Sequence, residues 1–232
     1  MWLILSDLHL NFNFEAIEDL NYDYVVCLGD LYNLEHQKEE LQPSIDAIFY
    51  KILQRFSINK QQLLFIPGNH DPNYCFQDIE YQNATNLNLK TISIDNDLLF
   101  GLGGSISSFI IGNKEIEWKG YPHQYEDYVL QSLNDIKCSI LLTHQGPSNT
   151  STSLYDKTPL VSHTAIEGGS YEIRLWILNN KPKLVIHGHV HVGRGMQSIG
   201  NTLIVNPGAY RDGYYCIIDI NTMDIQFKKC KL

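Results

Sequence analysis

The chain of 232 residues has no apolar run near the ~18 residues of a membrane-spanning helix, so we expect no membrane segment. Its first ten residues, MWLILSDLHL, have neither the basic start nor the cleavage site of a secretory signal peptide. Asp7 and His9 in this stretch are candidate site residues. We therefore expect the start of the chain to be retained and the protein to be cytoplasmic.

Positive charge is also scarce. Lys and Arg number 17 against 26 Asp and Glu, which gives a formal net charge of −9. A broad surface for nucleic acid or anionic membranes needs an excess of Lys and Arg, so neither is expected as the main partner. If some acidic residues bind cations, the formal net charge overstates how negative the protein is. Nucleic acid therefore remains a secondary alternative as a partner.

Closely spaced cysteine pairs are absent as well. The chain has five cysteines, which is an odd number, and none belongs to a CxxC pair. This pattern favours buried small apolar residues in a reducing compartment over a disulfide framework or a zinc–thiolate site.

The chain does have short apolar runs that alternate with helix-like stretches. Apolar residues make up 44% of it, and no repeat or long linker interrupts it, so we expect one α/β domain over residues 1–232. Strands are predicted at WLILS, DYVVCLG, QLLFIPG, LKTISI, LLFGLGG, CSILLTH, KLVIHG, NTLIVNPG and YYCIIDI. Helices are predicted at FEAIEDL, at EHQKEELQPSIDAIFYKILQRF with Pro43 as its start or break, at QYEDYVLQSLNDI, and at SYEIRLWILNN with Ser170 as its cap.

Polar side chains of metal-binding type follow five of these apolar runs. In chain order they are Asp7 and His9, Asp30, Asn69 and His70, His144, and finally His189 and His191. Ligand sites of open α/β sheets lie beyond the carboxyl ends of the strands. Five strand ends that all carry such side chains therefore predict one shared metal site.

Five short motifs hold these residues, namely SDLH (6–9), GD (29–30), GNHD (68–71), TH (143–144) and GHVH (188–191). Each motif is weak alone, but together and in this order they resemble the calcineurin-like metallophosphoesterase superfamily, over nearly the whole chain. The resemblance implies an α/β fold, a four-layer αββα sandwich in which helices flank two mixed β-sheets. It also implies two divalent metal ions at the strand ends.

The resemblance also implies which residues hold the metals. By resemblance, the first metal is bound by Asp7, His9 and His191, the second by Asn69, His144 and His189, and both by Asp30. Carboxylate, imidazole and amide donors suit Mn, Fe, Zn or Ni rather than Cu(I). A bridging carboxylate offsets the repulsion between two cations ~3.5–4 Å apart.

Within GNHD, His70 is the candidate catalytic residue that is not a ligand. By resemblance it donates a hydrogen bond to a phosphoryl oxygen or protonates the leaving group, as suits a side chain with an ordinary pKa near working pH. Asp71 is expected to accept a hydrogen bond from the His70 ring, with a turn residue before Pro72 as the alternative. Gly68 and Gly188 are expected to permit the turns that present the ligands. The expected chemistry is hydrolysis of a small phosphodiester or phosphomonoester by a metal-bridging hydroxide.

Departures from the superfamily pattern narrow the class. GDLYN lacks the arginine, and GNHD lacks the glutamate, that mark calcineurin-type serine/threonine phosphatases. Recombination-repair nucleases share GNHD but carry capping segments and basic surfaces, so a nuclease is one alternative, and a weakly catalytic metal-binding scaffold is the other. A closer resemblance, to the small Icc-related predicted phosphoesterases, is carried by GLGGS (101–105), GGSYEI (168–173), HGHVHVGRG (187–195) and TLIVNPGAYRDG (202–213). This closer resemblance identifies no substrate.

Several residues near the motifs have weaker claims. His187 is expected to be a neighbour of the site with a backbone or side-chain partner, and not a ligand. Residues 145–170 form a long connection after His144 and are the candidate substrate-facing flap. Arg194 and Arg211 are candidates for phosphate contact, with an ordinary exposed arginine as the alternative for each.

Overall fold

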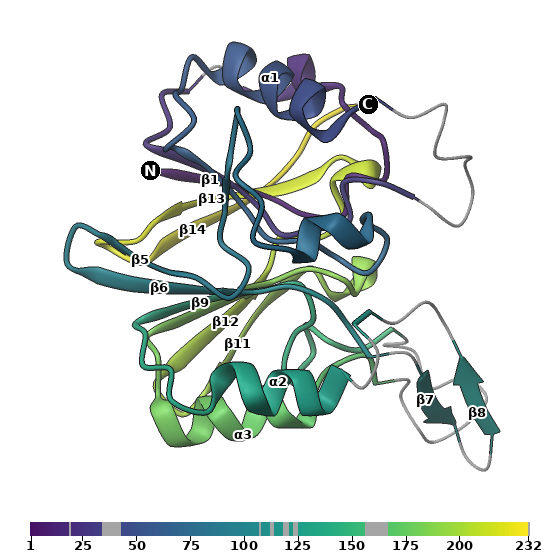
Figure 1. Ribbon diagram of the computed structural model, residues 1–232. Coiled ribbons are helices and arrows are strands. Elements are labelled where there is room, and N and C mark those ends of the chain that lie inside the picture. The colour runs from purple at the N-terminus through teal and green to yellow at the C-terminus, as the bar shows by residue number, and fades with distance from the viewer. Residues whose placement is uncertain are drawn as a thin grey trace.

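Two six-stranded sheets face each other, and helices cover both outer faces (Figure 1). The order of layers is helix, sheet, sheet, helix, which confirms the expected four-layer αββα sandwich. This computed structural model describes residues 1–18, 20–33, 43–106, 108–111, 114–117, 121–122, 125–155 and 167–231. No helix among those residues is long and apolar enough to cross a membrane.

The first sheet has the strand order β14-β13-β1-β2-β3-β4. Strands β1 to β4 run parallel, and β13 pairs antiparallel with both β1 and β14. The strands span Trp2–Leu5 (β1), Tyr24–Cys27 (β2), Leu63–Phe65 (β3), Thr85–Asn86 (β4), Tyr214–Asp219 (β13) and Asp224–Lys229 (β14).

The second sheet has the order β11-β12-β10-β9-β6-β5 and is also mixed, since its edge strands β5 and β11 are antiparallel to their neighbours. Its strands span Thr91–Ile94 (β5), Asp97–Leu102 (β6), Ile140–Thr143 (β9), Leu184–His187 (β10), Gly195–Ile199 (β11) and Thr202–Asn206 (β12). A separate hairpin of β7 and β8 stands away from both sheets in Figure 1, with strands at Ser108–Ile111 and Lys114–Glu117.

Helix α1 (Ile45–Phe56) covers the first sheet, while α2 (Tyr125–Leu133) and α3 (Tyr171–Asn180) cover the second (Figure 1). The Ser44 side chain accepts a hydrogen bond from the backbone of the first turn of α1, which therefore begins just after Pro43. Ser170 caps α3 in the same way, as predicted. Residues 35–42 of the predicted second helix lie outside the described residues.

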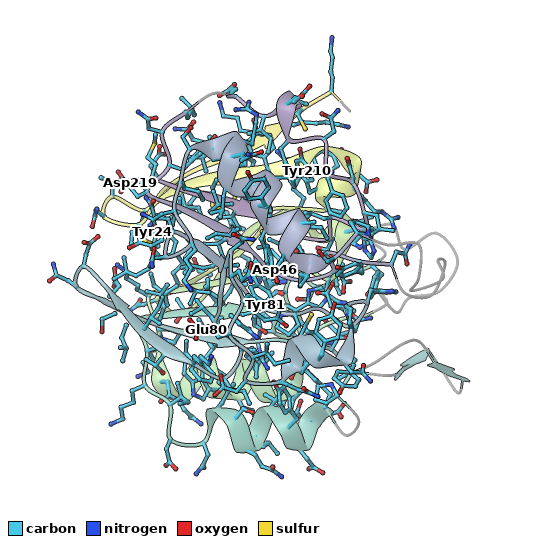
Figure 2. The ribbon with its side chains drawn as sticks, turned by 45° about the horizontal axis from the view of Figure 1, so that its top comes forward. Tyr24, Asp46, Glu80, Tyr81, Tyr210 and Asp219 are labelled. Atoms are coloured by element: carbon cyan, nitrogen blue, oxygen red, sulfur yellow. The ribbon has the colours of Figure 1, made fainter. Side chains whose placement is uncertain are left out.

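Three apolar cores fill the spaces between the four layers. Successive side chains of a strand point to opposite faces, and β1 shows the result. Leu3 and Leu5 lie in the core beneath α1, while Trp2 and Ile4 lie in the core between the sheets. Figure 2 shows Tyr210 among the side chains of the first of these cores. The third core joins the second sheet to α2 and α3.

The predicted helix at FEAIEDL (14–20) is wrong. The described residues of this stretch, 14–18 and 20, contain one 3₁₀ turn, Phe14–Ala16, and Ile17 is extended. The Arg55 guanidinium, which projects from α1, donates hydrogen bonds to the carbonyl oxygens of Phe14 (3.0 Å) and Ile17 (2.6 Å). The Phe14 carbonyl oxygen also accepts the Ile17 amide at 3.2 Å, which closes the 3₁₀ turn, while the Ile17 carbonyl oxygen is bonded to the Arg55 side chain.

The parallel strands end level with one another at one edge of each sheet. Leu5 of β1 pairs with Cys27 of β2, and Cys27 pairs with Phe65 of β3. In the second sheet, His187 of β10 pairs with Thr143 of β9. The motifs that follow these strands are thereby delivered to one common edge.

Candidate metal centre

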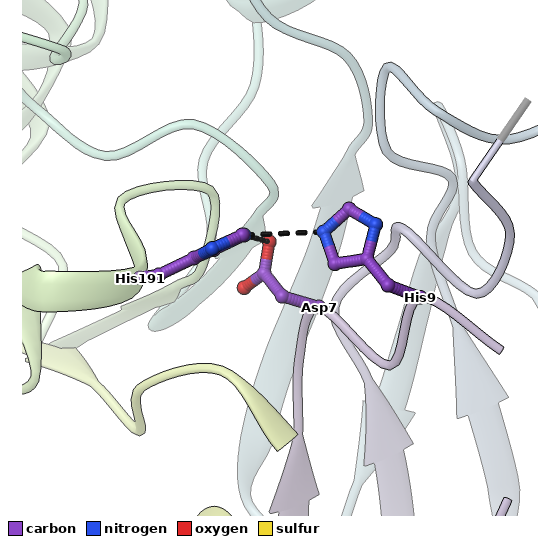
Figure 3. Close-up of side chains that lie close together, drawn as sticks. All are labelled: Asp7, His9 and His191. Atoms are coloured by element: carbon purple, nitrogen blue, oxygen red, sulfur yellow. Dashed lines mark hydrogen bonds and ion pairs between the residues drawn. The ribbon is translucent and has the colours of Figure 1, made fainter. Parts of the chain in front are cut away.

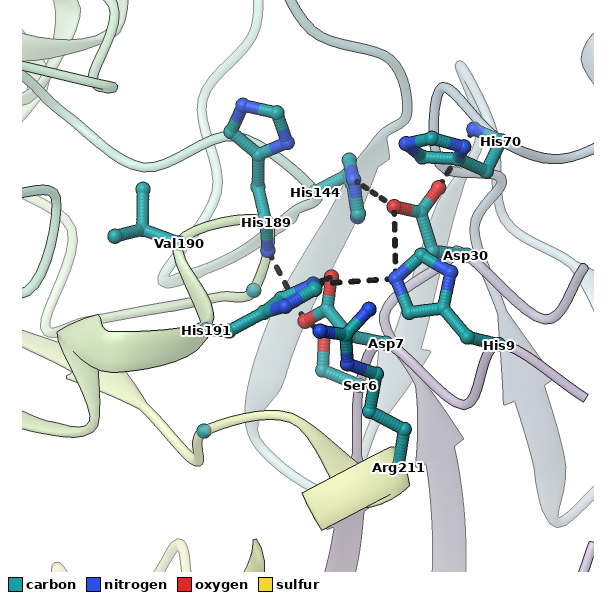
Figure 4. Close-up of polar contacts among 12 residues, drawn as sticks. Ser6, Asp7, His9, Asp30, His70, His144, His189, Val190, His191 and Arg211 are labelled. Atoms are coloured by element: carbon teal, nitrogen blue, oxygen red, sulfur yellow. Dashed lines mark hydrogen bonds and ion pairs between the residues drawn. The ribbon is translucent and has the colours of Figure 1, made fainter. Parts of the chain in front are cut away.

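Six predicted ligands form two clusters at the carboxyl ends of the strands (Figure 4). In each cluster, one possible ligand atom of every residue lies within 4.8 Å of the others. The first cluster is Asp7, His9 and His191, and the second cluster is Asp30, His144 and His189. The structure therefore groups these side chains as the motifs implied.

In the first cluster, the Nε2 atoms of His9 and His191 lie 3.1 Å apart, and His191 Nε2 lies 3.4 Å from Asp7 Oδ1 (Figure 3). Asp7 Oδ2 accepts hydrogen bonds from the Ser6 hydroxyl (2.6 Å) and the His189 amide (3.1 Å). Asp7 Oδ1 is buried and accepts no hydrogen bond from any described residue. A buried oxygen of this kind, facing two ring nitrogens, fits a cation.

Asp30 lies between the two clusters. Its Oδ2 is 3.3 Å from His144 Nε2 in the second cluster and 3.8 Å from His9 Nε2 in the first. Its Oδ1 accepts a hydrogen bond from the His70 amide at 2.7 Å, which fixes the carboxylate. Asn69 Oδ1 completes the second cluster, 3.1 Å from His144 Nε2. The arrangement fits a carboxylate shared by two ions.

Contacts behind the ligands orient the rings. His144 Nδ1 lies 2.7 Å from the Leu28 carbonyl oxygen, which can only accept. In the neutral ring the hydrogen is therefore on Nδ1, and the lone pair of Nε2 faces the cluster. His189 Nε2 lies 3.1 Å from the Tyr155 hydroxyl, a contact that helps to orient this ring.

Four of the predicted ligands adopt the left-handed backbone conformation that residues other than glycine rarely take. The φ angles are 53° at Asp7, 44° at His9, 52° at Asp30 and 65° at His189. Each costs of order 1–3 kcal/mol and persists only where the surroundings enforce it. Hydrogen bonds from the Asp7 amide to Gly29 O (3.0 Å) and from the His9 amide to Asp30 O (2.9 Å) provide part of that enforcement.

Charges within the clusters perturb their pKa values. Burial would raise the pKa of Asp7, but the neighbouring His191 ring, with its positive charge when protonated, lowers it below its usual range. Burial likewise opposes ionisation of Asp30, yet the His144 charge and hydrogen bond hold its pKa well below normal. Burial lowers the pKa of His189 to about 3, whereas the pKa of His144 rises to about 9 because Asp30 outweighs the effect of burial. The carboxylates are therefore anionic, and a cation would compete with a proton at His144.

Residues 7–230 match the profile of the metallophosphoesterase family of the calcineurin superfamily. The chain belongs to this family. The resemblance to this superfamily that the motifs carried is thereby confirmed.

One curated relative and two solved structures are also similar to this chain. The uncharacterized protein MJ1162 of Methanocaldococcus jannaschii is 29% identical over 151 residues, which make up 63% of each chain, so the match spans just under two thirds of that relative's length. One crystal structure superposes with a TM-score of 0.67 at 20% identity, covering 99% of this chain and 98% of the other. The crystal structure of TT1561 of Thermus thermophilus has a TM-score of 0.60 at 19% identity, with 98% and 97% covered. These two structural likenesses show the fold alone.

His70 of this metallophosphoesterase lies beside the first cluster. Its ring stands edge-on to the His9 ring, with centroids 5.2 Å apart, and its Nδ1 is buried without a hydrogen bond to a described residue. The expected bond to Asp71 is not formed. The Asp71 carboxylate instead accepts hydrogen bonds from the backbone amides of Tyr32 (3.0 Å) and Gly68 (2.8 Å). These two bonds close the loop that carries His70. Burial and the charge of Asp30 raise the pKa of Asp71 to about 7.

Gly68 begins the turn that carries Asn69 and His70, and Gly188 directly follows the last residue of β10, as expected. Neither is among the glycines with a positive φ, and after β10 it is His189 that adopts one. A Cβ on Gly68 would overlap the Asp30 carboxylate, and one on Gly188 would overlap the Ser6 hydroxyl. Glycine is required here because ligand-bearing segments approach each other closely.

His187 is a buried neighbour of the site, as predicted. Its Nδ1 lies 3.1 Å from Gly188 O and its Nε2 lies 2.9 Å from the Thr152 hydroxyl, and it belongs to neither cluster. Burial lowers its pKa to about 4, so the ring is neutral. Since a carbonyl only accepts, Nδ1 donates to Gly188 and Thr152 donates to Nε2.

The described flanks of the candidate flap (145–155 and 167–170) are tied to each other and to the centre, which is unlike an open flap. Gln145 donates to Gly168 O at 2.8 Å, and Tyr155 reaches His189. Residues 156–166 lie outside the described residues. Sequence reasoning missed Ser6, Thr152 and Tyr155, because their contacts come from segments far apart in the chain and no local pattern marks them.

The two candidate phosphate-contact arginines have different surroundings. The Arg194 guanidinium lies 5.1 Å from the ring centroids of both Tyr214 and Phe227, so it packs as a cation between aromatic rings. Arg211 lies beside Asp7 and His191 in Figure 4.

Proposed function

We propose that this metallophosphoesterase hydrolyses a small phosphodiester or phosphomonoester at a pair of divalent ions. The observation that carries the proposal is the position of Asp30 Oδ2, which faces His144 and His9 from two different clusters. A carboxylate that faces two sets of nitrogen donors is the arrangement a two-ion site requires. We propose Mn, Fe, Zn or Ni as the ions, and the cytoplasm as the location.

The chain's own residues have distinct parts in this proposal. Asp7, His9 and His191 would hold the first ion, Asn69, His144 and His189 would hold the second, and Asp30 would be shared between the two sets. When bound, two such ions supply Lewis acidity that lowers the pKa of water toward ~7 and offsets phosphate charge. His70 holds a proton beside the site and donates it to a phosphoryl oxygen or to the leaving group.

Two other functions are weaker. A nuclease needs a basic surface for the phosphate backbone, and the net charge of −9 opposes one. A scaffold without catalysis would not need a histidine that contributes no ligand, yet His70 lies beside the cluster with a buried, unbonded ring nitrogen.

The test starts from metal-stripped protein reloaded with Mn²⁺. Turnover is compared on p-nitrophenyl phosphate, bis-p-nitrophenyl phosphate, cyclic nucleotides and single-stranded DNA. We expect hydrolysis of at least one small ester. Processive degradation of DNA would favour the nuclease, and no turnover with two ions bound would favour the scaffold.

His70→Ala provides the matched test of mechanism. We expect a lower kcat, by ~10²–10⁴-fold for a lost proton donor, with metal content unchanged. His187→Ala, which removes a buried histidine outside both clusters, is the control. Loss of metal from the His70 variant would show that His70 is a ligand.

A further inference from the structure

Three of the four arginines of the chain are engaged in packing or backbone contacts. Arg55 donates to two carbonyl oxygens of the 14–17 segment, and Arg174 donates to Ser148 O at 3.0 Å. Arg194 lies against two aromatic rings. The remaining arginine is Arg211, and it is the one that lies beside the metal centre.

The backbone places Arg211 at the first cluster. It belongs to the 3₁₀ turn Tyr210–Asp212, which follows β12 and precedes β13. The Arg211 amide donates to the Asp7 carbonyl oxygen at 3.1 Å, and the Tyr210 amide donates to Ser6 O at 2.7 Å. The turn is thus bonded directly to the segment that carries a ligand.

The side chain of Arg211 is free to bind an anion. Figure 4 shows its guanidinium beside Asp7 and His191, and its charge acts on the His191 ring. Its side chain is 45% exposed, and its ion pair with Asp212 is long, with 3.8 Å between Arg211 Nε and Asp212 Oδ1. Such an exposed pair contributes little, so the guanidinium does not have to break a strong bond to bind elsewhere.

We infer that Arg211 binds a terminal phosphate oxygen of the substrate and thereby favours phosphomonoesters over phosphodiesters. The inference rests on the proposed function, because it concerns the substrate of the same site. A guanidinium matches phosphate oxygens in geometry and charge. A monoester has three terminal oxygens and two negative charges, whereas a diester has two oxygens and one charge. The monoester therefore has an oxygen to offer a guanidinium that lies beside the metal ligands.

The experiment compares wild type with Arg211→Gln and Arg211→Lys, all loaded with Mn²⁺. Lys181→Gln is the control, because it removes one exposed positive charge at the C-terminal end of α3, next to the amino end of β10 and away from the centre. The first readout is the affinity for inorganic phosphate by calorimetry. The second is KM and kcat for p-nitrophenyl phosphate and bis-p-nitrophenyl phosphate, and metal content is measured throughout.

We expect Arg211→Gln to weaken phosphate binding and to raise KM for the monoester by ~10-fold or more, as for a lost charged hydrogen bond. The KM for the diester should change less, Arg211→Lys should retain part of the effect, and metal content should stay normal. Unchanged phosphate affinity, or equal changes for both esters, would overturn the inference.

The two proposals fail separately. If the wild type hydrolyses neither ester, the proposed function fails, while the phosphate calorimetry still decides whether Arg211 binds the anion. If the wild type is active and Arg211→Gln binds phosphate as tightly as Lys181→Gln does, only the role of Arg211 is wrong.

Discussion

The two clusters of the metal centre differ in exposure. In the second cluster the side chains of His144 and Asp30 are 0% and 2% exposed, and a backbone carbonyl orients the His144 ring. In the first cluster the His191 side chain is 24% exposed, and Arg211 lies beside it in Figure 4. The first cluster therefore reaches solvent through His191, while His144 and Asp30 of the second cluster are fully buried at the strand ends. Replacing a histidine in one cluster should therefore reduce the stability of the protein by a different amount than replacing a histidine in the other.

The largest effect on metal binding is expected from Asp30→Asn, which removes the charge that the clusters share. Both ions should be lost together on dialysis, with activity reduced by more than the ~100-fold typical of losing a contact behind a ligand. Asparagine tolerates the left-handed backbone at this position, so the fold should survive. Elemental analysis measures the ion content. Loss of only one ion would mean that Asp30 does not join the clusters.

The comparison of clusters is sharpest for His144→Ala against His191→Ala. Each substitution should abolish binding of one ion. In metal-free protein, His144→Ala should cost about 2–4 kcal/mol of stability, because it leaves a cavity and an unpaired Leu28 carbonyl. His191→Ala should cost about 1 kcal/mol or less, since that ring is partly exposed. Denaturant unfolding in chelator measures both. Equal losses of stability would contradict the difference between interior and solvent-facing clusters.

Gly188→Ala should remove a hydrogen bond that supports Asp7, and so should affect the first cluster only. The added methyl group overlaps the Ser6 hydroxyl, so the hydrogen bond from Ser6 to Asp7 cannot persist. We expect ~10–100-fold weaker binding of the first ion and a stability loss of about 1–3 kcal/mol. Gly200→Ala is the control, because nothing lies within 4 Å of its Cβ position, and its positive φ confines the cost to local backbone strain. A control that loses metal equally would point to a general defect.

The smallest effect on metal binding is expected from His187→Ala. Both ions should remain, because neither ring nitrogen faces a cluster, while the loop that carries Thr152 loses a buried partner. Thr152→Val removes the same hydrogen bond without a large cavity. Hydrogen exchange around residues 150–155 should increase in both variants. Loss of an ion from His187→Ala would return this residue to the ligand set.

The sequence predicted the parts of the molecule that depend on local pattern. Strands β1, β2, β3, β9 and β10 are buried apolar runs with a polar residue at the end, so the pattern marks both the strand and the ligand after it. Strands β4, β7, β8, β11 and β14 were not predicted. Of these, β11 and β14 are partly exposed and carry no continuous apolar run. The stretch predicted as a helix at 14–20 contains a 3₁₀ turn instead, and Arg55, 38 residues or more away, donates to the carbonyl oxygens of Phe14 and Ile17, a contact that no local pattern marks.

The candidate site shows the same division. The motifs identify the donors and their grouping, since each donor type stands at a strand end. The left-handed backbone at Asp7 and His189, and the support of Ser6 for Asp7, depend on strands that meet only after folding. Asp71 shows where prediction from local sequence ends. Its position next to His70 in the chain suggested a contact with the His70 ring, whereas in the folded loop its carboxylate accepts hydrogen bonds from backbone amides.

The most direct test of the two-ion centre is anomalous diffraction from crystals of the protein loaded with Mn²⁺. The account predicts two peaks, one among Asp7, His9 and His191 and one among Asn69, His144 and His189, with Asp30 in contact with both. A single peak, or a second peak away from these side chains, would contradict it.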